Sequence, residues 1–185
     1  MNEVELIRAQ LCVERQHAAA VSHVLAASAD SRVTDRTASS VDAFRQAGVD
    51  YLEWTLTRFE AREQAYRDLL QARFTPEDPH RRAAEAAFAL EGTSRDALAK
   101  LASALNARSE AALWTDYLRY FSGAWSTRRD ELERVFESQA KVPDWRTVSG
   151  IDADSIFEER GRYARVRATL PAGVEMPALP GATRV

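Results

Sequence analysis

Apolar residues recur with the spacing of an α-helix along four long stretches of this sequence, and no feature constrains the fold more. The stretches are residues 4–25, 41–74, 79–105 and 109–140. Apolar side chains three or four positions apart gather on one face of a helix, and that face must be buried against another element. No stretch shows the alternating pattern of a β-strand. Because the connections are short, we predict an all-α fold built as an antiparallel up-and-down four-helix bundle.

The C-terminal part of the chain has a different pattern. We predict that residues 1–142 form the bundle and that residues 143–185 add a short fifth helix and an extended strap packed on it. The fifth helix covers residues 151–170, with Asp154 or Ser155 as its N-cap. Its apolar contacts are expected at Ile156, Phe157, Tyr163 and Val166. The final stretch, LPAGVEMPALPGATRV, holds three prolines and therefore cannot be regular helix.

Composition and charge exclude several classes of protein. The net charge of -3 gives no electrostatic basis for binding nucleic acid. The single cysteine, Cys12, excludes an internal disulfide and a thiolate cluster for zinc. No run approaches the roughly 20 apolar residues of a membrane span. The acidic start, MNEVELIRAQ, is unlike a secretory signal. We therefore expect a cytoplasmic protein that has no bound cofactor, does not bind nucleic acid and does not span a membrane.

A polar motif interrupts the first helical stretch. On a helical wheel, Glu14 falls in the middle of the apolar stripe and His17 falls on its edge, so both should point inward. Counting along an antiparallel neighbour places Tyr51 and Thr55 of the second helix level with them, and Trp114 to Leu118 of the fourth. The sequence therefore predicts a mid-bundle pocket. Its candidate ligand-binding residues are Glu14, His17, Tyr51, Thr55, Trp114 and Tyr117.

The same motif has the Glu-x-x-His spacing that some bundles use to hold two metal ions. The architecture and this one short motif are similar to those of ferritin-like and hemerythrin-like proteins. Such sites need further carboxylates and a second Glu-x-x-His on the other helices, and this sequence has three histidines in all and lacks that second half. We therefore predict no metal site; any metal that did bind would use Glu14 and His17. A Glu and a His satisfied within the core are the favoured interpretation, and a small-molecule pocket is the alternative.

Two arginines also lie on inner stripes. Arg62 should lie level with the first turn of the first helix, near Glu3 or Glu5, and Arg128 lies on the inner face of the fourth helix. Arginine on a stripe edge pairs well with carboxylates. We predict structural ion pairs, with an anion site at one end of the bundle as the alternative.

Three functions remain open at this point, and whether the protein is an enzyme is one of the open questions. The first is a non-enzymatic interaction or scaffold protein that self-associates or binds a protein partner. The second is a small-molecule-binding bundle with a pocket around Glu14, His17 and Tyr51. The third is a metal-dependent, oxygen-handling protein. A dry core with Glu14 bonded to a tyrosine would favour the first, a cavity beside His17 the second, and bound metal the third.

Overall fold

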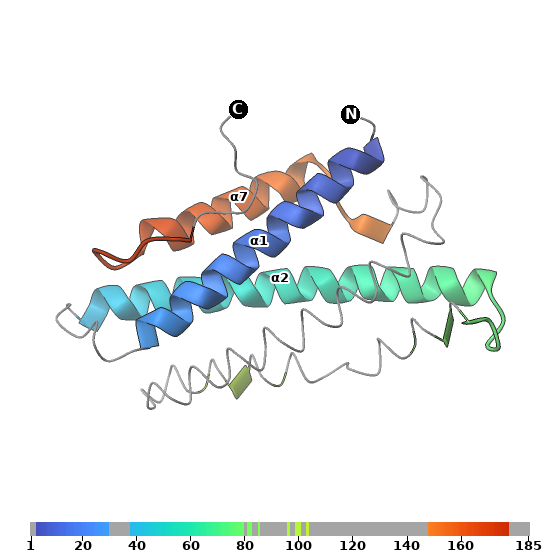
Figure 1. Ribbon diagram of the computed structural model, residues 1–185, viewed down its shortest axis with the longest axis horizontal. Helices are drawn as coiled ribbons and strands as arrows, with labels where there is room; N and C mark the ends of the chain where they lie inside the picture. Colours follow the sequence, from blue (N-terminus) through green and yellow to red (C-terminus); the bar gives the residue numbers. More distant parts are fainter. Residues whose placement is uncertain are drawn as a thin grey trace.

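The fold is seen in a computed structural model. It describes residues 3–29, 38–79, 81–82, 85, 96, 99–100, 103 and 148–177. The long helices within this part are α1 (Glu3–Ala29), α2 (Ala38–Arg73) and α7 (Ala153–Ala168). Each of them packs against the other two, with α1 and α7 on the same side of α2 (Figure 1). The described residues contain helix and no strand, which confirms the all-α class.

The predicted third and fourth helices lie almost wholly outside the described residues. The four-helix arrangement and the division at residue 142 therefore stay predictions. Within the described part, no helix carries an apolar stretch long enough to cross a bilayer.

The core between α1 and α2 follows the apolar stripes of the sequence. The buried apolar residues of α1 are Ile7, Leu11, Ala18, Ala20, Val21, Val24 and Leu25. Those of α2 are Phe44, Val49, Tyr51, Leu52, Leu56 and Phe59. Leu6, at the side of the first stripe, is half exposed. Burial of these two faces against each other holds the long helices together.

Gly48 marks a close approach of α2 to α1. A Cβ atom built on this glycine would lie 2.9 Å from both Cδ atoms of Leu25, closer than van der Waals contact allows. Leu25 is itself fully buried. The missing side chain therefore lets the two helices approach, and this offsets the poor helix propensity of glycine.

The segment before α7 turns sharply into that helix. Gly150 has a φ of 59°, in the left-handed region that glycine adopts without strain. Asp152 is the N-cap: its carboxylate accepts from the Ser155 amide at 2.7 Å, and the Ser155 hydroxyl accepts from the Asp152 amide at 2.9 Å. The predicted cap at Asp154 or Ser155 was wrong, because Ser155 takes the third helical position of this reciprocal pair.

The buried face of α7 also differs from the prediction. Phe157 is 81% exposed, whereas Tyr163 and Val166 are buried as expected. The residues that complete the buried face are Ser155 and Glu159. A helix with so few apolar residues therefore packs through a stripe that contains a carboxylate.

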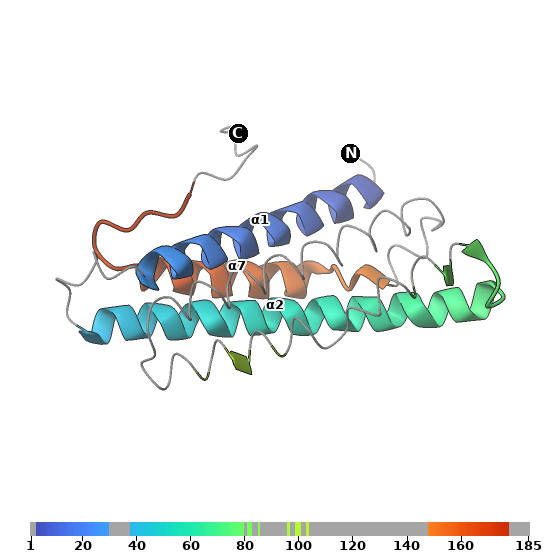
Figure 2. The ribbon, with the colours of Figure 1, turned by 60° about the horizontal axis from the view of Figure 1, so that its bottom comes forward.

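After α7 the chain reverses direction. The Val174 amide donates to the Pro171 carbonyl at 3.0 Å, and Gly173 has a φ of 75° at this turn. Residues 171–177 contain no helix. Figures 1 and 2 show this dark red segment turning back from the end of α7 on the side of α1.

Candidate functional site

The Glu-x-x-His motif of α1 is divided between two polar clusters. Glu14 turns to arginines of α2, whereas His17 turns to Glu159 of α7. The predicted mid-bundle site is thus separated into a structural clamp and a second centre beside a pocket.

The Glu14 cluster is a clamp on the chain that enters α7. The Glu14 carboxylate is 3% exposed and accepts from Nη2 of Arg62 at 2.7 Å. Nη2 of Arg58 lies 3.8 Å from its other oxygen. The same arginines donate to backbone carbonyls, Arg62 to Ser149 and Arg58 to Gly150 at 2.8 Å. These contacts tie the start of α7 to both long helices.

The clamp also corrects the predicted register of the helices. Arg62 was expected near Glu3 or Glu5, but it pairs with Glu14, nine residues farther along α1 than Glu5. Arg128, the other arginine predicted to form an ion pair, lies outside the described residues, as do Trp114 and Tyr117 of the predicted pocket.

Glu159 is the centre of the second cluster. It is completely buried, and its Oε1 accepts a hydrogen bond from the Tyr51 hydroxyl at 2.7 Å. Nδ1 of His17 lies 2.6 Å from the same oxygen. The Tyr163 ring stacks on the His17 imidazole with ring centroids 3.6 Å apart and planes within 7°. The histidine is therefore held by one bond and one ring face.

Tyr51 acts as a fixed donor in this cluster. Burial raises the pKa of its phenol far above the ordinary value, and the negative charge of Glu159 raises it further. Burial likewise raises the pKa of Tyr163. Thr55, also predicted for the pocket, donates to the Tyr51 carbonyl at 2.8 Å, a bond within its own helix.

A pocket of about 710 Å³ opens beside His17. Its walls come from α7, from the segment that turns back after α7, and from His17 of α1. The polar lining residues are His17, Arg160, Arg167 and Glu175, and Tyr163 stands among them. The apolar lining residues are Ala164, Leu170, Val174, Met176 and Pro177. The pocket therefore combines an apolar wall with a small set of charged groups.

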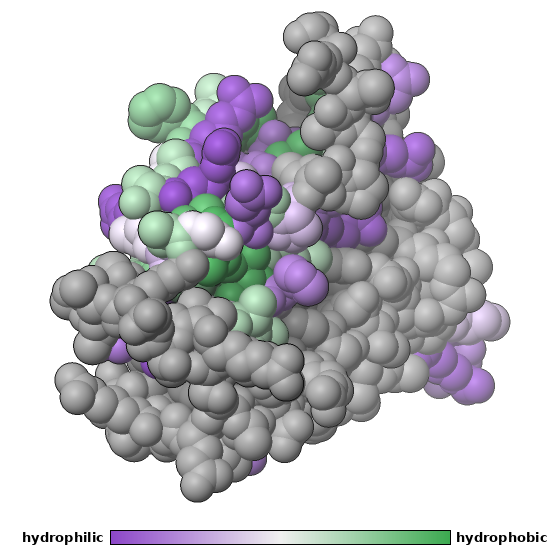
Figure 3. Space-filling model, turned by 60° about the vertical axis from the view of Figure 1, so that its left-hand side comes forward, coloured by the Kyte–Doolittle hydropathy of each residue, from purple (hydrophilic) through white to green (hydrophobic). Residues whose placement is uncertain are grey.

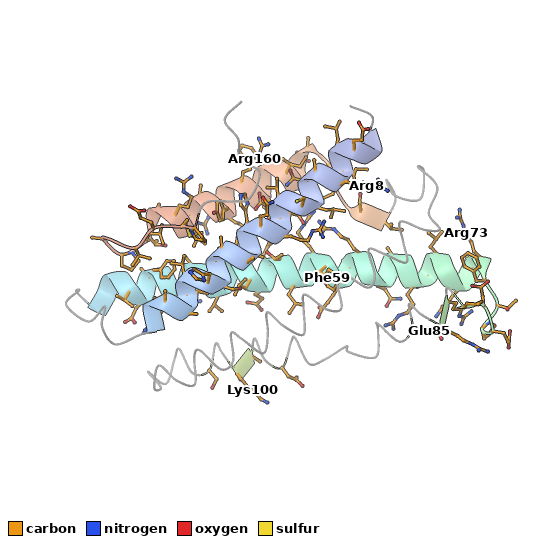
Figure 4. All side chains as sticks on the ribbon, viewed as in Figure 1. Arg8, Phe59, Arg73, Glu85, Lys100 and Arg160 are labelled. Atoms are coloured by element: carbon orange, nitrogen blue, oxygen red, sulfur yellow. The ribbon has the colours of Figure 1, made fainter. Side chains whose placement is uncertain are left out.

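The figures show the setting of this pocket. Figure 4 shows Arg160 on the side of α7 that faces away from α2. Figure 3 brings forward the end of the molecule where α7 finishes, and green apolar surface is framed there by purple hydrophilic groups. Apolar and hydrophilic residues thus lie side by side on this face.

One nitrogen of His17 is engaged within the cluster. Nδ1 faces Glu159, and one ring face is covered by Tyr163. The residue also lines the pocket, so Nε2 is the ring nitrogen left for a contact with a bound molecule.

The sequence interpretation missed the α7 half of this site. Glu159, Arg160 and Arg167 were not identified as site residues, and Tyr163 was predicted only as an apolar contact of the fifth helix. The one available signal was spacing: Ser155, Glu159 and Tyr163 are each four positions apart and share a helix face.

Metal binding has little support in this geometry. No group of three or more His, Cys, Asp or Glu that could hold a metal ion occurs within the described ranges. Glu14 is engaged by Arg62, and Nδ1 of His17 is engaged by Glu159. The two halves of the motif therefore do not converge on one point.

Comparisons with known proteins give no further guide. No protein-family model matches the sequence, and neither a curated protein nor a solved structure does.

Proposed function

We propose that this protein binds a small molecule in the pocket beside His17. The observation that carries the proposal is a pocket lined by a histidine whose Nδ1 is held by a fully buried carboxylate. Ligand sites are typically apolar clefts of about 300–1,000 Å³ with a few well-placed polar groups, and a volume of about 710 Å³ falls in that range.

The stability of the fold does not explain why a buried position of α7 carries the carboxylate of Glu159. Replacing a buried ionic group by a well-packed apolar side chain is often neutral or stabilising. Glu159 nevertheless sits on the buried face of α7 with one oxygen lacking any partner among the described residues. A carboxylate that orients a histidine toward a cavity gives a reason for its presence, because such second partners fix the imidazole orientation and tautomer.

A scaffold or self-association role has weaker support within the described part of the chain. Its large exposed apolar side chains there are Leu6 and Phe157, which lie on different helices. Single exposed apolar residues are ordinary on protein surfaces.

The proposal is tested with two fluorescent probes of matched shape, the neutral phenylnaphthylamine and its anionic analogue anilinonaphthalene sulfonate. At least one of them should bind saturably, at one molecule per chain. Ala164→Trp fills the pocket from the exposed side of α7 and should abolish this binding. Ala153→Trp places the same side chain on the same helix outside the pocket lining and should leave it unchanged. Absent binding, or binding that survives in Ala164→Trp, would contradict the proposal.

A further inference from the structure

We infer that the ligand of this pocket is an organic anion with an apolar body, bound by Arg160 and Arg167. The inference rests on the proposed function and names the ligand class of the same site. Two features carry it: the cations of the lining and the apolar wall.

The charged lining favours an anion. Arg160 and Arg167 both line the pocket, and neither has an ion-pair partner among the described residues. Nearby arginines are engaged: Arg62 with Glu14, and Arg162 with Glu158 at 2.9 Å. Glu175 is the opposing carboxylate of the lining. Two guanidinium groups against one carboxylate leave a positive excess, and guanidinium groups match carboxylate, phosphate and sulfonate geometry.

The apolar wall indicates that the part of the ligand away from its charged group is apolar. Leu170, Val174 and Met176 line the pocket beside the Tyr163 ring. Such a wall suits an aliphatic or aromatic body, and inorganic phosphate would leave it unfilled.

The test compares the affinities of anilinonaphthalene sulfonate and neutral phenylnaphthylamine under the same conditions. The expected result is an anion preference of about tenfold or more. The double substitution Arg160→Gln, Arg167→Gln should remove the preference. Arg165→Gln, an exposed arginine of α7 outside the lining, should retain it.

Equal affinities for both probes in the wild type, blocked by Ala164→Trp, would overturn the inference and leave the proposed function standing. Binding that Ala164→Trp does not block would overturn both.

Discussion

At the scale of single residues, Glu159 determines which side chains the buried face of α7 binds. It receives a hydrogen bond from Tyr51 and orients His17, while its second oxygen has no partner within the described residues. A buried acceptor that loses its donor bears the full desolvation cost of the group. The cluster is therefore sensitive to the removal of either partner.

Tyr51→Phe should lower the free energy of unfolding by about 1–3 kcal/mol, because it leaves Glu159 without its hydroxyl donor. Urea unfolding followed by circular dichroism measures the change. Tyr163→Phe is the matched control, since its ring stacks on His17 and its hydroxyl has no hydrogen bond among the described residues. Equal losses in the two variants would show that the Tyr51–Glu159 bond is unimportant.

The phenol of Tyr51 should also remain protonated at alkaline pH while the protein is folded. Burial, followed by the charge of Glu159, raises its pKa in the folded protein. Because this pKa is higher in the folded protein than in the unfolded chain, the protonated phenol contributes its full stabilisation below the unfolded pKa. The contribution is lost as the pH rises through the folded pKa. In an absorbance titration, one of the five tyrosines should ionise only as the protein unfolds. That late component should be missing in Tyr51→Phe, and its persistence would assign it to another tyrosine.

At the scale of secondary-structure elements, α7 depends on its N-cap. The hydrogen bonds with Ser155 lower the pKa of the Asp152 carboxyl. The cap therefore stabilises α7 fully above the ordinary aspartate pKa, and this stabilisation is lost as the pH falls through the lowered value. The Ser155 amide resonance should shift in that acid range. Asp152→Asn keeps a capping oxygen and should abolish the shift; a shift that remained would have another origin.

The contact of α1 with α2 depends on Gly48. Gly48→Val places methyl groups against Leu25, which is fully buried, and should destabilise the fold by about 1–3 kcal/mol despite better helix propensity. Ala61→Val, at an exposed position of the same helix, should change stability by less than about 1 kcal/mol. Comparable effects in both variants would mean that the helices are not closely packed at Gly48.

The same elements show how far the sequence alone could lead. Periodicity predicted the buried stripes of α1 and α2 because each stripe depends on residues three or four positions apart. Periodicity also predicted that Glu14 and His17 point inward. It could not identify their partners, because His17 and Tyr51 contact Glu159, which lies 142 and 108 positions away in the sequence. Only tertiary packing brings such distant residues together.

Two local errors have physical causes. Phe157 suggested an apolar face on the wrong side of α7, whereas the helix packs through Tyr163, Val166 and a satisfied carboxylate. Arg62 was placed by counting residues from the connection between α1 and α2, and counting does not fix how far one helix is shifted along another. The arginine could therefore be assigned an ion pair, but its partner could not be identified.

At the scale of the whole molecule, α7 joins both polar clusters to the two long helices. Arg58 and Arg62 fix the chain where α7 begins, and Glu159 holds His17 farther along the same helix. The segment after α7 then turns back to complete the pocket. We propose that this pocket, rather than an exposed apolar surface, binds a small molecule.

The most direct measurement is an amide nuclear magnetic resonance map of the protein with and without anilinonaphthalene sulfonate. We predict that the perturbed resonances cluster at His17, Tyr163, Ala164 and Val174, which line the pocket on three separate segments. Perturbations centred on the exposed side chains of Leu6 or Phe157 would place binding on the surface and contradict the proposed pocket.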